Sequence, residues 1–153
     1  MKNFSVLRFS LFLILLNVVF SCSSDSSSNS SIDPTPVINT VNKGTWRITF
    51  YEDSSVNETS NFAGYNFTFG SNSILSATNG VNVYVGTWSV TSDTSGDDSP
   101  SNDLDFNIAF ISPANFSELT EDWNILERTD TKIKLVHISG GNGGTDYITF
   151  EKN

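Results

Sequence analysis

From residue 44 to the C-terminus, apolar and polar residues alternate within short segments that turn residues separate. The first segment, 44–50, places Trp46, Ile48 and Phe50 on one face and polar side chains on the other. A period of two is typical of a β-strand with one buried face. The same pattern predicts further strands at 65–69, 74–78, 81–91, 104–110, 123–128, 132–138 and 147–152.

Three local motifs predict how these strands are connected. Asn79-Gly80 is typical of a two-residue type I′ hairpin, because both residues tolerate a positive φ. Gly86 lies inside a strand and predicts a bulge or a close backbone approach. Ser112-Pro113 predicts a helix start with Ser as the N-cap, after which Phe116 and Leu119 bury one side of a single turn.

Sequential hairpins and one short helix predict an all-β fold, an eight-stranded up-and-down antiparallel barrel. Closure into a barrel removes the two exposed edges of an open sheet. The inward-facing residues are expected to be Trp46, Ile48, Phe50, Tyr65, Phe67, Phe69, Leu75, Trp88, Val90, Phe106, Ile108, Phe110, Trp123, Ile125, Ile133, Leu135, Ile148 and Phe150. Side chains this large favour a filled interior, although an eight-stranded barrel can also hold one small ligand.

The pattern of apolar and polar residues in the N-terminal stretch differs from that of the predicted strands. Lys2 and Arg8 precede an apolar run at 11–20 that is too short to cross a bilayer, and this arrangement is typical of a secretory signal peptide over 1–21. The segment 22–42 is rich in Ser and predicts a disordered, flexible tether. The barrel domain is therefore expected over 43–153.

Two motifs carry a resemblance to known families. Val19-Phe20-Ser21-Cys22 resembles the lipobox of bacterial lipoproteins, in which the cysteine is lipidated and becomes the first residue of the mature protein. Gly44-Thr45-Trp46 opens the first strand and resembles the Gly-x-Trp start of lipocalins. The stretch 43–153 is similar to the lipocalin-like domains of lipoproteins from Bacteroidetes, of the flavobacterial type.

The resemblance implies an outer-membrane lipoprotein, anchored through an acyl chain on Cys22 and open to exposure at the cell surface. It also implies a small apolar or amphipathic ligand inside the barrel. The ligand-binding candidates are then Trp46, Tyr65, Phe67, Trp88, Phe106 and Trp123. The alternative is a solid-core surface module, structural or inhibitor-like, that contacts protein or glycan.

The charge and the cysteine content of the chain restrict the classes of partner that it is expected to bind. The chain has 17 acidic and 8 basic side chains, and its net charge of −9 becomes −11 without Lys2 and Arg8 of the expected signal peptide. An acidic surface disfavours nucleic acid, whose binding depends on Lys and Arg contacts to phosphate. Cys22 is the only cysteine, so no disulfide is expected. We expect a monomer whose membrane contact is the acyl anchor.

Catalytic chemistry has few candidates. His137 is the only histidine, at the end of a predicted strand, and the Gly-x-Ser-x-Gly motif is absent. With Cys22 assigned to the lipid, the sequence leaves no plausible zinc set. Glu118, Glu121 and Asp122 flank a helical turn and could supply a glycosidase-type carboxylate pair, but we interpret them as solvated. We predict a non-enzymatic protein without a cofactor.

The weak metal candidate is an acidic loop that contains Asp93, Asp97, Asp98 and Asp103. Clustered carboxylates are ligands that calcium prefers. The loop fails the EF-hand pattern, however, because Gly96 stands at the fourth position and no Glu stands at the twelfth. A solvated hairpin loop is the preferred interpretation.

Overall fold

The computed structural model describes residues 32–92, 103–141 and 143–153. Its strands are β1 (Trp46–Asp53), β2 (Val56–Asn57), β3 (Asn66–Phe69), β4 (Ile74–Thr78), β5 (Val83–Ser92), β6 (Leu104–Ala109), β7 (Glu121–Arg128), β8 (Lys132–Ile138) and β9 (Thr145–Lys152). The helical segments are α1 (Thr35–Val41), the 3₁₀ turn η1 (Thr59–Phe62) and α2 (Ala114–Ser117).

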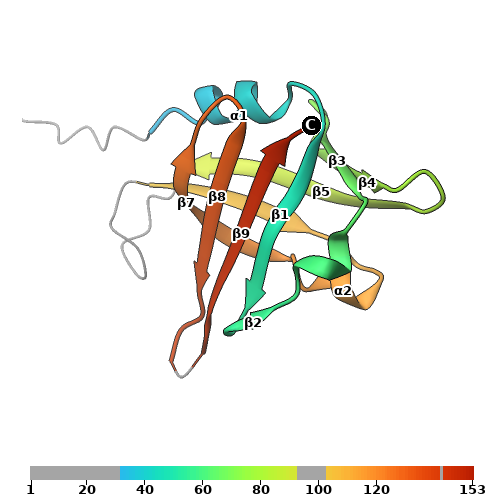
Figure 1. Ribbon diagram of the computed structural model, residues 1–153. Helices are drawn as coiled ribbons and strands as arrows, with labels where there is room; N and C mark the ends of the chain where they lie inside the picture. Colours follow the sequence, from blue (N-terminus) through green and yellow to red (C-terminus); the bar gives the residue numbers. More distant parts are fainter. Residues whose placement is uncertain (1–31, 93–102, 142) are drawn as a thin grey trace, which may run out of the picture.

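The strands form a closed barrel (Figure 1). Apart from the two-residue β2, each strand pairs antiparallel with the next one along the chain, and β1 pairs with β9 to close the ring. The predicted eight-stranded up-and-down barrel is therefore confirmed, with β2 as a short addition beside β1. Closure leaves all eight principal strands with a neighbour on both sides, which removes the open sheet edges.

The interior is occupied by the aromatic and aliphatic side chains that alternation predicts. Trp46, Phe67, Phe106 and Trp123 have no solvent-exposed surface. At the centre, the Phe69 ring lies 5.4 Å from the ring of Trp88, 5.6 Å from that of Phe106 and 5.4 Å from that of Phe150. These distances are typical of aromatic rings in direct contact, so side chains from opposite sides of the barrel meet in its middle.

The inward position predicted for Phe50 is wrong. A register irregularity in β1 follows Ile48, so that Ile48 pairs with Phe150 but Phe50 pairs with Thr149. The extra residue reverses the alternation, so that Tyr51 is buried and Phe50 turns to the outer face of the barrel.

A second irregularity lies in β7, where Ile125 pairs with Leu135 and Glu127 pairs with Lys134. The intervening Leu126 is 59% exposed. Leu126 lies on the outside of the barrel, as alternation from the inward Ile125 requires, and the bulge moves the next residue, Glu127, to the outer face as well.

The predicted tether ends earlier than expected, because its last residues fold into α1. Val37 and Val41 of this helix are buried against the barrel core. Arg128 of β7 donates a hydrogen bond to the Thr40 hydroxyl at 3.1 Å and holds the helix in place. Pro in the first turn suits a helix start, and α1 lies across one end of the barrel (Figure 1). The remainder of the predicted tether, up to residue 31, lies outside the described residues.

Two local predictions are corrected. Strands β4 and β5 are joined by a four-residue loop, in which the Asn79 side chain accepts hydrogen bonds from the amides of Val81 and Asn82 at 3.1 and 2.8 Å. This side-chain turn replaces the predicted type I′ hairpin. At α2, Pro113 rather than Ser112 occupies the N-cap position. Phe116 is nevertheless fully buried, as predicted.

Gly86 marks a close approach and not a bulge, because its pairing with Leu75 continues in regular register. A Cβ atom at this position would collide with the backbone oxygen of Ala109 and would lie 2.8 Å from the ring of Phe110. Since backbone cannot move aside cheaply, a side chain here forces the barrel wall apart.

We expect Gly86→Ala to lower the free energy of unfolding by about 2–3 kcal/mol, in the range of overpacked cores. Gly140→Ala is the matched control, because a Cβ atom there meets nothing within 4 Å. Urea denaturation of both variants measures the difference. Equal losses would contradict the close approach at Gly86.

Candidate functional site

The predicted interior site contains six residues, and the structure brings five of them together in the core. Trp46, Phe67, Trp88, Phe106 and Trp123 are all buried. Tyr65 is only half-buried, and its ring packs against those of Tyr84 and Phe116 at 5.8 and 5.0 Å. The five buried residues thus belong to the packed hydrophobic core of the barrel.

The polar groups of the three indoles are already occupied. Trp46 donates its indole N–H to the carbonyl of Val41 at 2.9 Å, and Trp88 donates to that of Gly70 at 2.9 Å. The Trp123 indole donates to the Leu119 carbonyl at 3.1 Å. A ligand pocket needs a few free polar groups that orient the ligand. These donors instead hold α1, the β3–β4 turn and the segment after α2 onto the barrel.

The barrel end opposite α1 is covered by η1 and α2. Phe62 and Phe116 are fully buried there, with their rings 5.3 Å apart. The Tyr51 hydroxyl donates to the Glu118 carbonyl at 3.0 Å. Burial, assisted by nearby carboxylates, raises the pKa of Tyr51, so the hydroxyl stays protonated as this hydrogen bond requires. Helical segments therefore cover both ends of the barrel.

Next to this cover, the inward-facing stripes of three adjacent strands end in polar residues. Glu121 has the same strand parity as the buried Trp123 on β7. His137 pairs with Asp146, and both stand at inward positions at the same rim of the barrel. The pairing of β7, β8 and β9 brings these polar residues together. Their grouping is therefore not visible in the sequence around each of them.

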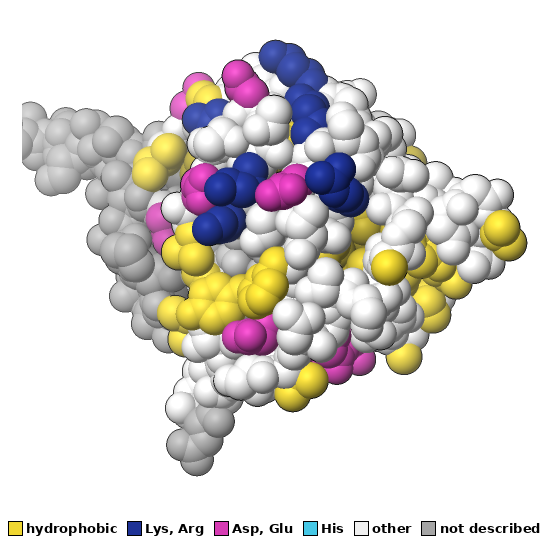
Figure 2. Space-filling model, in the orientation of Figure 1, with side chains coloured by type: hydrophobic (Ala, Val, Ile, Leu, Met, Phe, Trp, Pro, Cys, Tyr) yellow, Lys and Arg dark blue, Asp and Glu magenta, His cyan; other side chains and the backbone are white. Residues whose placement is uncertain are grey.

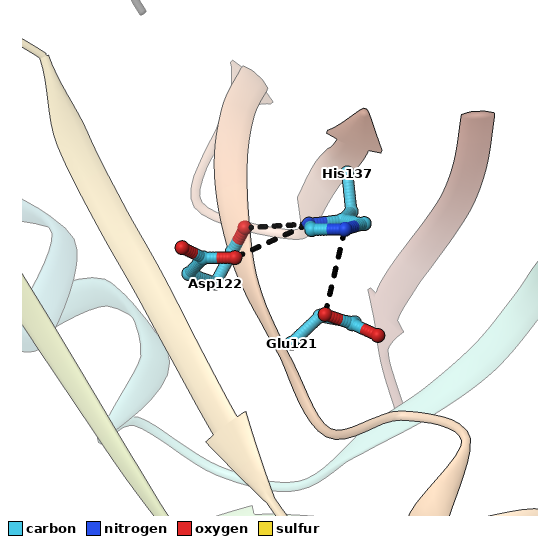
Figure 3. Close-up of side chains that lie close together, drawn as sticks. All are labelled: Glu121, Asp122 and His137. Atoms are coloured by element: carbon cyan, nitrogen blue, oxygen red, sulfur yellow. Dashed lines mark hydrogen bonds and ion pairs between the residues drawn. The ribbon is translucent and has the colours of Figure 1, made fainter. Parts of the chain in front are cut away.

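At this rim His137 lies between two carboxylates (Figure 3). Its Nε2 atom is 3.4 Å from Glu121 Oε2. Its Nδ1 atom is 3.2 Å from Asp122 Oδ1 and 3.2 Å from the backbone oxygen of Asp122. The side chain is 16% exposed, and its ring lies edge-on to Trp123 at 6.2 Å. The imidazole is thus held by several contacts and still reaches solvent.

The rim carries an excess of negative charge. Burial raises the pKa of Glu121 above its ordinary value, and the carboxylates of Asp122, Asp146 and Asp53 raise it further, whereas His137 opposes the shift. The Asp146 carboxylate is also buried and accepts a hydrogen bond from the Ser54 amide at 2.7 Å. A cation would be favoured at this position.

The sequence predicts that Glu121 and Asp122 are solvated, and it gives no connection between them and His137. The residues stand 15 positions apart or more in the chain, and their spacing matches no known motif. The sequence contains one signal for this site. At the end of the apolar stripe of β8, a histidine stands at a position where alternation predicts an apolar residue. Only the pairing of β7 with β8 shows which side chains meet it.

A second feature is an apolar patch on the outer face of β1, β7, β8 and β9, formed by Phe50, Leu126, Val136 and Tyr147 (Figure 2). Tyr147 is 37% exposed, whereas Val136 is covered although it points away from the main core. A groove of about 550 Å³ runs between Phe50, Leu126 and Tyr147. We call these four residues the outer patch.

Charged side chains border the outer patch. Glu127 forms ion pairs with Lys132 at 2.8 Å and with Lys134 at 3.4 Å, and the lysines lower the pKa of Glu127. Figure 2 shows Lys and Arg side chains beside the apolar band on this face. An apolar centre with a charged border is the arrangement typical of protein interfaces.

Several predicted positions lie outside the described residues, namely Cys22 and the acidic-loop residues Asp93, Asp97 and Asp98. Asp103 of that loop is described and stands, partly buried, just before β6. Among the described helices, none combines the length and the apolar character that a bilayer span requires. Comparison with protein-family models, curated proteins and solved structures found no match.

Proposed function

We propose that this protein is a lipid-anchored, non-enzymatic surface module whose solid barrel binds a partner protein through the outer patch. The observation that carries the proposal is the β-bulge in β1, which turns Phe50 outward beside the exposed Leu126. Bulges re-aim side chains and are often found beside functional sites. Without the bulge in β1, strand alternation would place Phe50 inside the barrel.

The packed interior supports this function over the carriage of a small ligand. Five of the six predicted ligand-binding residues are buried in the core, and the indole donors bond to the backbone of the closing segments. A ligand inside the barrel would have to displace these side chains and break these hydrogen bonds. The lipocalin resemblance therefore bears on the shape of the domain, and the binding of a small apolar molecule is the less favoured function.

A protein partner fits the outer patch better than a glycan. Buried interface centres are enriched in aromatic residues and depleted in charge, and the patch supplies the rings of Phe50 and Tyr147 beside the exposed Leu126. The Glu127 ion pairs lie at the border, where charge steers encounter more than it adds affinity.

Anchoring and location rest on the lipobox resemblance at Cys22. An acyl chain there would attach the domain to the outer membrane, and the Ser-rich segment would hold it away from the lipid surface. The absence of enzymatic activity is proposed because His137 contacts carboxylates rather than a hydroxyl nucleophile.

The test is site-specific photocrosslinking in the cells that make the protein. With benzoylphenylalanine at position 126, we expect a discrete covalent adduct with one protein, detected by its mass. The matched control carries the probe at Thr91, an exposed position on β5, away from the patch strands. Adducts of equal yield at both positions, or none at position 126, would contradict the proposal.

A further inference from the structure

We propose that Glu121 and His137 bind a divalent transition-metal ion, zinc by preference, at the barrel rim, and that Asp122 orients the imidazole. The inference is independent of the proposed partner surface. It follows from the three side chains of Figure 3, whose possible ligand atoms all lie within 4.8 Å of one another.

The spacing of the two ligand atoms suits a metal ion. Zinc bonds to imidazole nitrogen and carboxylate oxygen are about 2.1 Å long, so two ligands at a tetrahedral angle stand about 3.4 Å apart. The distance from His137 Nε2 to Glu121 Oε2 is 3.4 Å. A charge-assisted hydrogen bond between the same groups would be shorter, at about 2.7–2.9 Å. The two atoms therefore stand at a distance at which one zinc ion can bind both of them.

The opposite side of the imidazole is arranged as metal-binding histidines require. A histidine ligand commonly donates its other ring N–H to a carboxylate or a backbone carbonyl, which fixes the tautomer. Nδ1 of His137 faces both groups of Asp122, each at 3.2 Å. A proton on Nδ1 leaves Nε2 unprotonated, so that its lone pair can bind a metal ion.

The surroundings favour a cation of this class. The carboxylates of Asp146 and Asp53 act on Glu121 and leave the rim negative. An imidazole ligand suits zinc, copper and nickel, whereas calcium and magnesium prefer oxygen ligands alone. Two protein ligands leave coordination positions for water or for a side chain of a bound partner, so we expect micromolar rather than structural-site affinity.

The experiment is calorimetric titration of Zn²⁺ into the full-length chain without a histidine tag, in detergent. A Cys22→Ser background removes the thiol, which would itself bind zinc. We expect one saturable site, at least ten-fold weakened by His137→Gln and by Glu121→Gln. Asp122→Ala should weaken it by less than loss of a ligand, because the backbone oxygen of Asp122 still accepts from Nδ1.

The matched control is Glu127→Gln, which removes a carboxylate of the same strand that pairs with lysines instead. It should leave zinc affinity unchanged. Bound Cu²⁺ should quench the fluorescence of Trp123, whose ring lies 6.2 Å from that of His137, and Trp123→Phe should remove most of this quenching. Absence of a saturable site, or equal affinity in His137→Gln, would show that the cluster is only an ion pair.

Discussion

Replacing Phe106 by alanine should lower the free energy of unfolding by about 3–5 kcal/mol, the range observed when a buried aromatic ring leaves a cavity. Phe106 has no exposed surface, and its ring contacts those of Phe69 and Trp88 at 5.6 and 5.9 Å. Because β-strands fix these neighbours from several directions, the core cannot collapse into the space. Denaturant unfolding, followed by Trp fluorescence, measures the loss.

The matched control is Phe50→Ala, the same substitution at a half-buried position on the outer face. It should cost less than half as much. A fluorescent fatty acid, titrated while Trp emission is followed, should show no saturable micromolar binding to the wild type. A small loss for Phe106→Ala, together with micromolar fatty-acid binding, would instead demonstrate an open interior.

Replacing Cys22 by alanine should abolish the incorporation of a labelled fatty acid in cells and leave an unprocessed precursor or a released domain. The sulfur of Cys22 is the only thiol in the chain, so no second residue can accept the thioether lipid of a bacterial lipoprotein. The expected effect is complete loss of label, measured after immunoprecipitation.

The neighbouring Ser23→Ala variant is the control for this experiment and should retain the label. Equal labelling of the wild type and of Cys22→Ala would overturn the lipoprotein proposal and, with it, the proposed outer-membrane location. It would leave the fold and the outer patch untouched, because both depend on residues after position 31.

The sequence by itself determined the strands and the class of fold. Alternation with period two identifies a strand from its own residues, since each buried side chain lies two positions from the next. It placed Trp46, Phe67, Phe106 and Trp123 in the core correctly. Sequential hairpins then left closure as the way to remove open edges, and Gly86 was recognised because a glycine inside a strand often marks a close approach.

Only the tertiary structure decided where the inward–outward alternation of β1 and β7 is interrupted. A bulge depends on the register with the neighbouring strand, and the residues of one strand alone do not contain that register. Phe50 was therefore predicted inside although it lies outside. The helix α1 was missed because a seven-residue helix is stable only through the surface that it buries, and that surface belongs to the folded barrel.

The tertiary structure also created the rim cluster. Glu121 and His137 are neighbours because β7 and β8 pair antiparallel and both stripes end at the same rim. In the sequence alone, each of the two is an ordinary polar residue at the end of a predicted strand. Strand pairing brings distant residues within a few ångströms, and this is why the candidate metal site, unlike the barrel, could not be predicted from the spacing of residues in the sequence.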